Sequence, residues 1–320
     1  MLEKRRLGKT DILVSEIGLG GFQLGEKTII NDNVNTSFGG MNEDNSISLI
    51  QKAVELGVNT FDTADVYSLG NSEYRLGKAL KNFRDEVNIF TKAGNIISNP
   101  GQIDISYHHL MAAIDRSLER LQTDYVDLFQ IHVPPQTEKE FAEIEKVFSE
   151  VKSENKSRYC GISVGIRYDM GLEIIRRGIA DSIQIYFSLI DTDPLKELLP
   201  LAKKYNIGVI IAEPLAQGLL SNKYKVGHIF PSTDLRSNGY TTKLLEKKLK
   251  RVKQFEFLIN ENRTLNQAAL AYILTKDEIS TCIPGAKSIE QLESNILSKD
   301  IELNQIELNK INEIQNSWNE

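Results

Sequence analysis

Cysteine is scarce in this sequence: only Cys160 and Cys282 occur among its 320 residues. They lie far apart in apolar, strand-like segments, which is typical of buried thiols in a reducing compartment and gives no support to a disulfide framework or a zinc cluster. No segment is apolar and long enough to span a bilayer, and residues 1–6 do not begin an apolar signal sequence. We therefore expect a cytoplasmic protein with no metal site and no membrane partner.

An excess of charge of one sign is also lacking. The net charge is −6 with both signs interspersed along the chain, so no basic face is available for nucleic acid. With 41% hydrophobic residues, the 320-residue chain can bury a full-sized core, and we predict one domain spanning residues 1–320. A small molecule is the expected partner, and the composition does not predict an oligomeric state.

Strand and helix patterns alternate along the whole chain. A hairpin is predicted first, with strands at residues 4–7 and 12–15 and Gly8 in its turn. Eight apolar runs then predict strands at residues 17–20, 58–62, 87–92, 125–131, 159–163, 182–185, 209–213 and 281–283. Amphipathic helices separate these runs, and the strands are too apolar to face water. The alternation predicts an α/β fold closed as a (β/α)8 TIM barrel, with an open doubly wound sheet as the alternative.

Two connections are much longer than the few residues that usually join a strand to a helix. They cover residues 21–42 after the first strand and residues 217–242 after the seventh. Both leave the C-terminal end of a predicted strand, which is the end where barrels of this kind carry their active sites. We expect the two segments to form lids over that face of the barrel.

Three neighbouring strands end in reactive side chains. The run at residues 58–62 ends in Asp62, with Tyr67 shortly after it, and the next two runs end at Lys92 and His132. Singly, Asp62 could cap the next turn and Tyr67 could be an ordinary half-buried ring. Lys92 could be a solvated strand end, and His132 could be a hydrogen-bonded structural residue. Together, at the same end of a parallel sheet, they predict a proton-transfer site.

The set resembles the catalytic tetrad of the aldo-keto reductases, which implies reduction of an aldehyde or ketone to an alcohol. Hydride transfer leaves negative charge on the carbonyl oxygen, so the site needs a proton donor. A free tyrosine has a pKa of about 10, a nearby ammonium lowers that pKa, and a carboxylate keeps the ammonium charged. Tyr67 is then the general acid, supported by Lys92 and Asp62. His132 would orient the carbonyl oxygen.

The hydride must come from a cofactor, yet no Gly-x-Gly-x-x-Gly motif follows the first strand, so a Rossmann fingerprint is not met. The resemblance instead implies NADPH, with NADH possible, bound extended across the barrel. The positions that match the family's cofactor contacts are Gly21, Phe22, Ser163, Gln184, Tyr186, Pro214, Leu215, Gly218, Leu219, Gly285, Lys287, Gln291 and Asn295. Three positions depart from the family pattern, since Val164 replaces an asparagine, Ala212 an aromatic or arginine side chain, and Ser294 a glutamate.

The segment at residues 283–295 is the most specific cofactor signal. In the family it receives the adenosine 2′-phosphate, and a basic residue beside a helix N-terminus is an anion site. Lys287 supplies the charge, without the bidentate grip of an arginine. Gln291 is spaced to form a capping box with Ser288, so it could serve the helix alone.

Two other functions are compatible with these motifs. A non-catalytic member of the family could bind NADPH as a regulatory sensor, and a Schiff-base lyase could use Lys92 on the same fold. Asp62 argues against the lyase, because a Schiff-base lysine needs a depressed pKa and a carboxylate raises it. Sugars, ketosugars and small aldehydes all fit the expected pocket walls. These walls are Phe22, Phe38, Asp65 and residues 132–135.

Overall fold

A computed structural model gives the structure of the chain. It describes residues 2–26, 29–30, 34–35, 40–99, 101–231 and 234–319, and the statements below concern those residues.

Eight parallel strands form a single sheet in which each strand pairs with the next one along the chain. They are β3 Leu19–Gly20, β6 Thr60–Asp62, β7 Asn88–Ala93, β8 Val126–Ile131, β9 Ser157–Gly165, β10 Ser182–Tyr186, β11 Gly208–Ala212 and β12 Thr281–Cys282. The two ends of the sheet meet, because Ile17 forms a parallel bridge with Cys282 and the Gly18 N–H donates to the Cys282 carbonyl at 2.8 Å. The predicted closed barrel is therefore confirmed, and the open doubly wound sheet is excluded.

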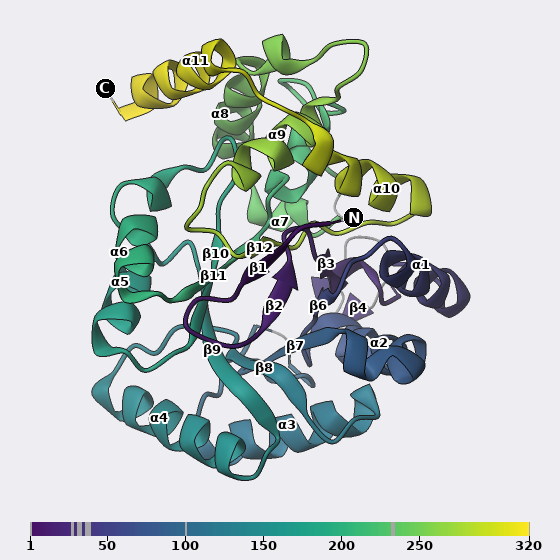
Figure 1. Cartoon of the computed structure of the whole chain (residues 1–320), viewed down its shortest axis with the longest axis vertical. Helices are drawn as coiled ribbons and strands as arrows, with labels where there is room; N and C mark the ends of the chain where they lie inside the picture. Colours follow the sequence, from purple (N-terminus) through teal and green to yellow (C-terminus); the bar gives the residue numbers. More distant parts are fainter. Residues whose placement is uncertain are drawn as a thin grey trace.

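Helices surround the barrel (Figure 1). They are α1 Glu43–Glu55, α2 Asn71–Leu80, α3 Tyr107–Leu121, α4 Glu138–Ser153, α5 Tyr168–Arg177, α6 Leu198–Tyr205, α8 Thr242–Lys253, α9 Leu265–Leu274, α10 Ile289–Ile296 and α11 Gln305–Asn316. Capping explains several of their starts. Thr137 and Glu140 form a capping box at the start of α4, and Ser288 caps α10. No described helix has the length and apolar character that a membrane crossing requires.

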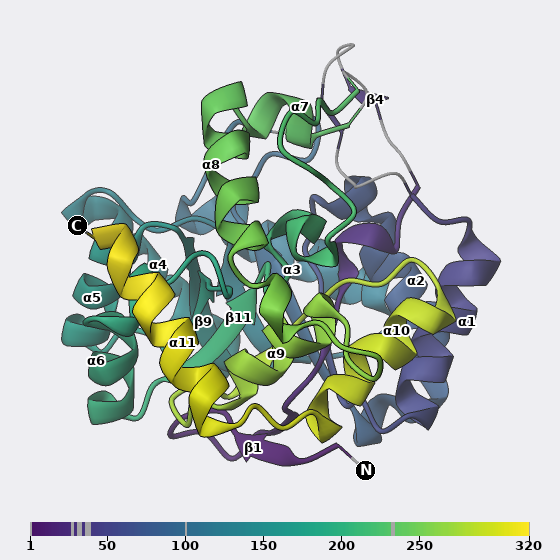
Figure 2. The ribbon, with the colours of Figure 1, turned by 90° about the horizontal axis from the view of Figure 1, so that it is seen from above.

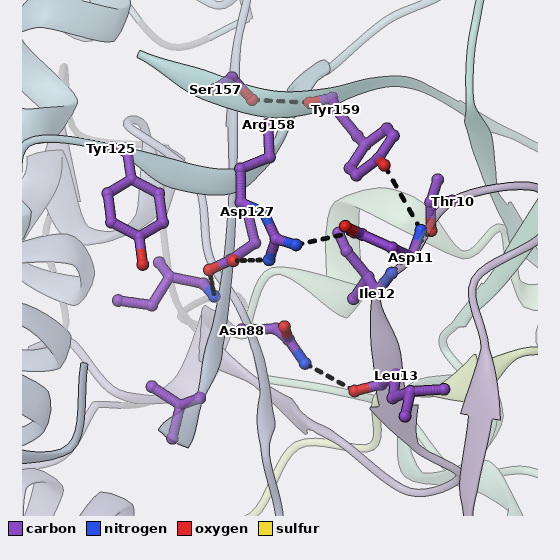
Figure 3. Close-up of polar contacts among 12 residues, drawn as sticks. Thr10, Asp11, Ile12, Leu13, Asn88, Tyr125, Asp127, Ser157, Arg158 and Tyr159 are labelled. Carbon is purple, nitrogen blue, oxygen red and sulfur yellow. Dashed lines mark hydrogen bonds and ion pairs between the residues drawn. The ribbon is translucent and has the colours of Figure 1, made fainter. Parts of the chain in front are cut away.

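The N-terminal hairpin closes one end of the barrel. Its strands are β1 Lys4–Arg6 and β2 Leu13–Ser15, as predicted. Apolar side chains of the hairpin pack on interior residues of the barrel strands, and the buried members of this cluster are Leu7, Ile12, Val14, Phe90, Leu128, Ile210, Ala212 and Ile283. Polar contacts hold the hairpin in place: Arg158 bridges Asp127 at 2.8 Å and Asp11 at 2.7 Å, and Asn88 donates to the Leu13 carbonyl at 2.9 Å (Figure 3).

The two long connections lie at the opposite end of the barrel. The first contains the short segments η1 Gly21–Gln23, β4 Ile29–Ile30 and β5 Val34–Asn35, and the second contains η5 Ala216–Ser221 and α7 Arg236–Gly239. Figure 2 shows β1 on one side of the molecule and both β4 and α7 on the other. The hairpin thus covers the N-terminal end of the barrel, and the two long connections lie at the C-terminal end.

Candidate active site

Lys92 and Asp62 form a buried ion pair inside the barrel. Asp62 ends β6 and Lys92 lies in the neighbouring strand β7, with side chains 2% and 0% exposed. The Lys92 Nζ lies 2.5 Å from Asp62 Oδ1 and donates to the Thr63 carbonyl at 2.8 Å. A buried ammonium is tolerated only when it is paired and hydrogen-bonded, and these contacts meet that condition.

The other Asp62 oxygen receives two amide donors. Oδ2 accepts Gln130 Nε2 at 3.0 Å and Gln184 Nε2 at 2.8 Å. Both glutamines are buried, on β8 and β10. They fix the carboxylate that holds Lys92. Sequence reasoning missed Gln130, whose only signal is a polar side chain within an otherwise buried strand.

Tyr67 is held in place by a tight turn that follows β6. Its N–H donates to the Ala64 carbonyl at 3.1 Å. Ser68 and Leu69, directly after it, have left-handed φ values of 48° and 57°. Ser68 Oγ anchors this turn by donating to the Glu26 carbonyl at 2.9 Å. Strained backbone of this kind is typical of functional sites.

The phenol of Tyr67 faces the buried pair. Lys92 Nζ lies 3.4 Å from Tyr67 Oη, and the His132 ring lies 5.6 Å from the Tyr67 ring in an edge-on arrangement. Phe22 also packs edge-on against the phenol, with ring centroids 5.0 Å apart. Tyr67 and His132 are both half-buried, unlike the lysine beneath them. The structure thus brings the predicted catalytic residues together at the C-terminal end of the barrel.

The electrostatics of Tyr67 differ from the sequence-based expectation. Burial raises the pKa of Tyr67 well above its usual value, and the carboxylates of Asp62, Glu213 and Asp65 raise it further. Burial also lowers the pKa of Lys92, against the opposing effect of Asp62. The expected lowering of the tyrosine pKa is therefore absent in this state, because desolvation outweighs the nearby ammonium.

His132 is a neutral side chain in this site. Burial, together with the charge of Lys92, lowers the pKa of His132 to about 3. A neutral imidazole has one donor and one acceptor nitrogen. Within the described part of the chain, His132 Nδ1 is buried and has no hydrogen-bond partner. The ring can therefore donate one hydrogen bond to a bound oxygen without carrying a charge.

A second carboxyl group lies beneath the surface next to this cluster. Asp65 is 1% exposed, and neither of its oxygens finds a hydrogen-bond partner among the described residues. Burial, reinforced by the charge of Glu73, raises the pKa of Asp65 to about 8. Asp65 is therefore not an exposed pocket wall. Phe38, also expected in the wall, lies outside the described residues.

Basic side chains gather at the N-terminus of α10. Arg236 and Lys223, both from the long connection after β11, are close enough to Lys287 for their charges to lower its pKa, after a larger effect of partial burial. Asp234 opposes this effect and pairs with Arg236 at 2.7 Å. Only Lys287 was identified from the sequence. The other two cations are distant from Lys287 in the sequence, and the length of the loop that carries them was the one sign that this loop is functional.

Two other residues of this region that were predicted to contact the cofactor, Gln291 and Asn295, form hydrogen bonds with the local backbone. Gln291 Oε1 accepts the Lys287 N–H at 2.9 Å, and its own N–H donates to Ser288 Oγ at 3.3 Å. Asn295 is buried and its Nδ2 lies 3.4 Å from the Gly285 carbonyl. These contacts order the turn that presents Lys287.

The other predicted cofactor residues line the same end of the barrel with different exposure. A Cβ on Gly21 would lie 2.8 Å from the Asp62 carbonyl, so only glycine fits there. Ser163 on β9 is buried and pairs in register with Gln184, while the half-buried Tyr186 pairs with Ala212. The segment after β11 is less uniform. Pro214 and Leu219 are buried, whereas Leu215 and Gly218 are half-buried.

The parallel barrel and the cluster of ionisable side chains at its C-terminal end define a (β/α)8-barrel protein with a candidate active site at that end. The profile of the Aldo/keto reductase family matches residues 16–316. The oxidoreductase YqkF of Bacillus subtilis is 34% identical over 298 residues, covering 92% of this chain and 90% of the relative. The NADH-specific methylglyoxal reductase of Escherichia coli is 30% identical over 318 residues, covering 94% and 95%.

A solved structure has the same fold. The holo form of aldo-keto reductase AKR11C1 from Bacillus halodurans matches with a TM-score of 0.81 at 30% identity, covering 98% of this chain and 96% of that one. The chain therefore belongs to the aldo/keto reductase family, and the relatives described above are oxidoreductases or reductases.

Proposed function

We propose that the protein catalyses the reversible, NADPH-dependent reduction of an aldehyde or ketone to an alcohol, with Tyr67 as general acid. The observation that carries this proposal is the position of Lys92. Its Nζ contacts Asp62 at 2.5 Å and Tyr67 Oη at 3.4 Å at the C-terminal end of the barrel. This is the arrangement that a proton donor at a carbonyl oxygen requires.

The residues of the chain have distinct tasks in this proposal. Tyr67 holds its proton in the resting site, because its pKa is raised, and delivers it to the carbonyl oxygen as negative charge develops there. Lys92 then stabilises the tyrosinate that remains, since its ammonium lies beside the phenol oxygen. The neutral His132 donates a hydrogen bond that orients the carbonyl. In alcohol oxidation the same tyrosinate is the base.

The cofactor choice rests on the basic residues at α10. When bound, a nicotinamide cofactor supplies the hydride. A phosphate monoester fits the convergence of Lys287, Arg236 and Lys223 near the start of a helix, and this favours NADPH. A relative is named for its NADH specificity, so NADH is the alternative to be tested alongside. The methylglyoxal named for that relative makes small aldehydes the first substrates to examine, before sugars and ketosugars.

Tyr67→Phe tests the proposal. This variant should bind NADPH almost as well as the wild type and lose carbonyl reduction by roughly 10²–10⁴-fold, because it lacks the proton and keeps the ring. The measurement is the disappearance of NADPH absorbance over a panel of small aldehydes and sugars. Tyr159→Phe, whose hydroxyl contacts the hairpin at the other end of the barrel, is the matched control and should stay active.

The result also separates the enzyme from a regulatory NADPH-binding protein. An enzyme reduces at least one carbonyl of the panel and loses that activity in Tyr67→Phe. If the wild type binds NADPH and turns over none of the panel, the sensor is favoured. Near-normal kcat in Tyr67→Phe would remove Tyr67 from the mechanism.

A further inference from the structure

A buried glutamate connects helix α2 to the strand that carries Lys92. Glu73, in the first turn of α2, is fully buried, and its Oε1 accepts a hydrogen bond from Thr91 Oγ1 at 2.5 Å. Thr91 directly precedes Lys92 in β7, and its side chain is also buried. The hydrogen bond therefore ties the start of α2 to the residue next to the lysine that contacts Tyr67.

Arg120 of α3 occupies the other oxygen of this carboxylate. Two of its guanidinium nitrogens, Nε and Nη2, each lie 2.6 Å from Glu73 Oε2. The two side chains are 22% and 0% exposed, and α2 and α3 lie side by side outside the barrel (Figure 1). Because burying two charges costs about as much as their attraction returns, such a pair is weak evidence for a role in stability alone.

The same arginine lies against the turn that carries the phenol, residues 67–70, which we call the Tyr67 turn. A Cβ on Gly70 would lie 2.7 Å from Arg120 Cδ and 2.9 Å from its Nε, so the arginine side chain packs on the Gly70 backbone. Gly70 has a φ of +91° and follows Ser68 and Leu69, which are left-handed as well. Side-chain-bearing residues adopt this conformation only at a cost in free energy, and it persists where the surroundings hold it in place.

We propose that Glu73 and Arg120 are positioning residues for the proton transfer, an inference that rests on the proposed function. The pair holds the Tyr67 turn against β7 and so maintains the 3.4 Å contact between Tyr67 Oη and Lys92 Nζ. Glu73 acts through Thr91 on the lysine strand, and Arg120 acts through Gly70 on the turn. A displacement of about 1 Å at a reacting group can lower the rate by about 10²-fold.

Removing both charges at once tests the proposal. Glu73→Gln/Arg120→Gln leaves no unpaired buried charge, which a single neutral substitution would, and the amide oxygen at position 73 can still accept the Thr91 hydroxyl. The rate of a single turnover of bound NADPH with a saturating aldehyde should fall by about 10–100-fold per folded molecule, while the Kd for NADPH stays within about twofold of the wild type. Denaturant unfolding gives the folded fraction, and fluorescence titration gives the Kd.

Solvent deuterium separates positioning from a merely structural role. A displaced donor slows the transfer of the Tyr67 proton, so the ratio of the single-turnover rates in H2O and D2O should rise above the wild-type ratio. A variant that only unfolds more easily contains fewer active molecules, and its ratio stays at the wild-type value. A lower rate with an unchanged ratio would overturn the inference.

The matched control is a buried ion pair at the hairpin end of the barrel. Arg84 Nη2 pairs with the buried Asp127 at 2.9 Å, and Asp127 is joined through Arg158 to Asp11 of the hairpin. Asp127→Asn/Arg84→Gln should keep the wild-type rate per folded molecule and the wild-type isotope ratio. A wild-type rate in Glu73→Gln/Arg120→Gln, or an equal loss of rate in the control, would contradict the positioning role.

Arg120→Lys decides the question if the double substitution does not fold. It keeps a positive charge for Glu73, but an ammonium lacks the second nitrogen for Oε2 and the flat surface that lies on Gly70. The rate should fall by about threefold or more with the same rise in isotope ratio, and a smaller loss would refute the inference. If Tyr67→Phe is inactive while these variants match the wild type, only the positioning role fails. If the wild type reduces no carbonyl, the proposed function fails first.

Discussion

Replacing Asp65 with asparagine should stabilise the protein at neutral and alkaline pH. The wild-type carboxyl is 1% exposed and has no hydrogen-bond partner for either oxygen in the described structure. Ionising it in that environment is costly, and the negative charge of Glu73 adds to the cost. Asparagine has nearly the same shape and no charge to lose. The variant should therefore avoid the free-energy cost of burying an ionisable carboxyl, a cost that grows as the pH rises.

The magnitude follows from the two pKa values. The pKa of Asp65 is raised from 3.8 to about 8 in the folded protein, so between these values the folded state carries a proton that the unfolded state has released. The wild type therefore loses stability as the pH rises through this window, by about 1.4 kcal/mol per pH unit. At pH 7 the free energy of unfolding of the variant should exceed that of the wild type by an amount on the order of 4 kcal/mol, and this difference vanishes below about pH 4.

Denaturant unfolding at pH 4, 5.5, 7 and 8 measures this effect, because the midpoint and the slope of the transition give the free energy of unfolding. The exposed Asp85→Asn is the control, because it removes the same charge from the surface. The Asp65→Asn advantage should increase with pH, and the control should show a small and constant difference. A pH-independent difference, or destabilisation at pH 8, would refute the assignment of Asp65 as a buried, proton-carrying acid.

Three further predictions concern the catalytic and cofactor residues. Lys92→Met should abolish carbonyl reduction in a steady-state assay, and Lys92→Arg should retain a trace through its charge; a fully active methionine variant would contradict the role of the ammonium. Because His132 has a pKa of about 3, the pH profile of kcat/KM should lack a histidine inflection near pH 6.5, and a break that disappears in His132→Gln would contradict this assignment. Lys287→Ala and Arg236→Ala should each raise the Kd for NADPH by about one to two decades and leave NADH nearly unchanged, as measured by fluorescence titration at low salt. Equal weakening of both nucleotides would place the 2′-phosphate elsewhere.

The barrel could be predicted because its strands are buried on both faces. Each of the eight strands appears in the sequence as an apolar run, and the predicted ends differ from the observed ones by no more than two residues. These small errors arise because hydrogen-bond pairing sets strand ends and apolar character does not. Ile17, for example, was predicted inside the first strand but forms only an isolated bridge with Cys282.

The cluster of Asp62, Tyr67, Lys92 and His132 was predictable for a related reason, since its members follow or end neighbouring parallel strands. The side chains that contact this cluster from distant parts of the sequence were not predictable. Gln130 is 68 residues from its partner Asp62, and no local pattern distinguishes it from a misplaced polar side chain. Arg236 reaches the region of Lys287 through a long connection whose path depends on tertiary contacts, including its bond to the Gln217 carbonyl at 2.9 Å.

The sign of the electrostatic effect on Tyr67 is the part that residue identity alone predicted wrongly. A lysine beside a tyrosine predicts a lowered pKa, but that expectation assumes comparable solvation of both groups. Here burial of the Tyr67 phenol is the largest effect, and the carboxylates of Asp62 and Glu213 add to the cost of ionising it, so the ammonium of Lys92 does not lower the tyrosine pKa below its usual value. The resting site consequently favours a protonated phenol, which suits proton donation in reduction.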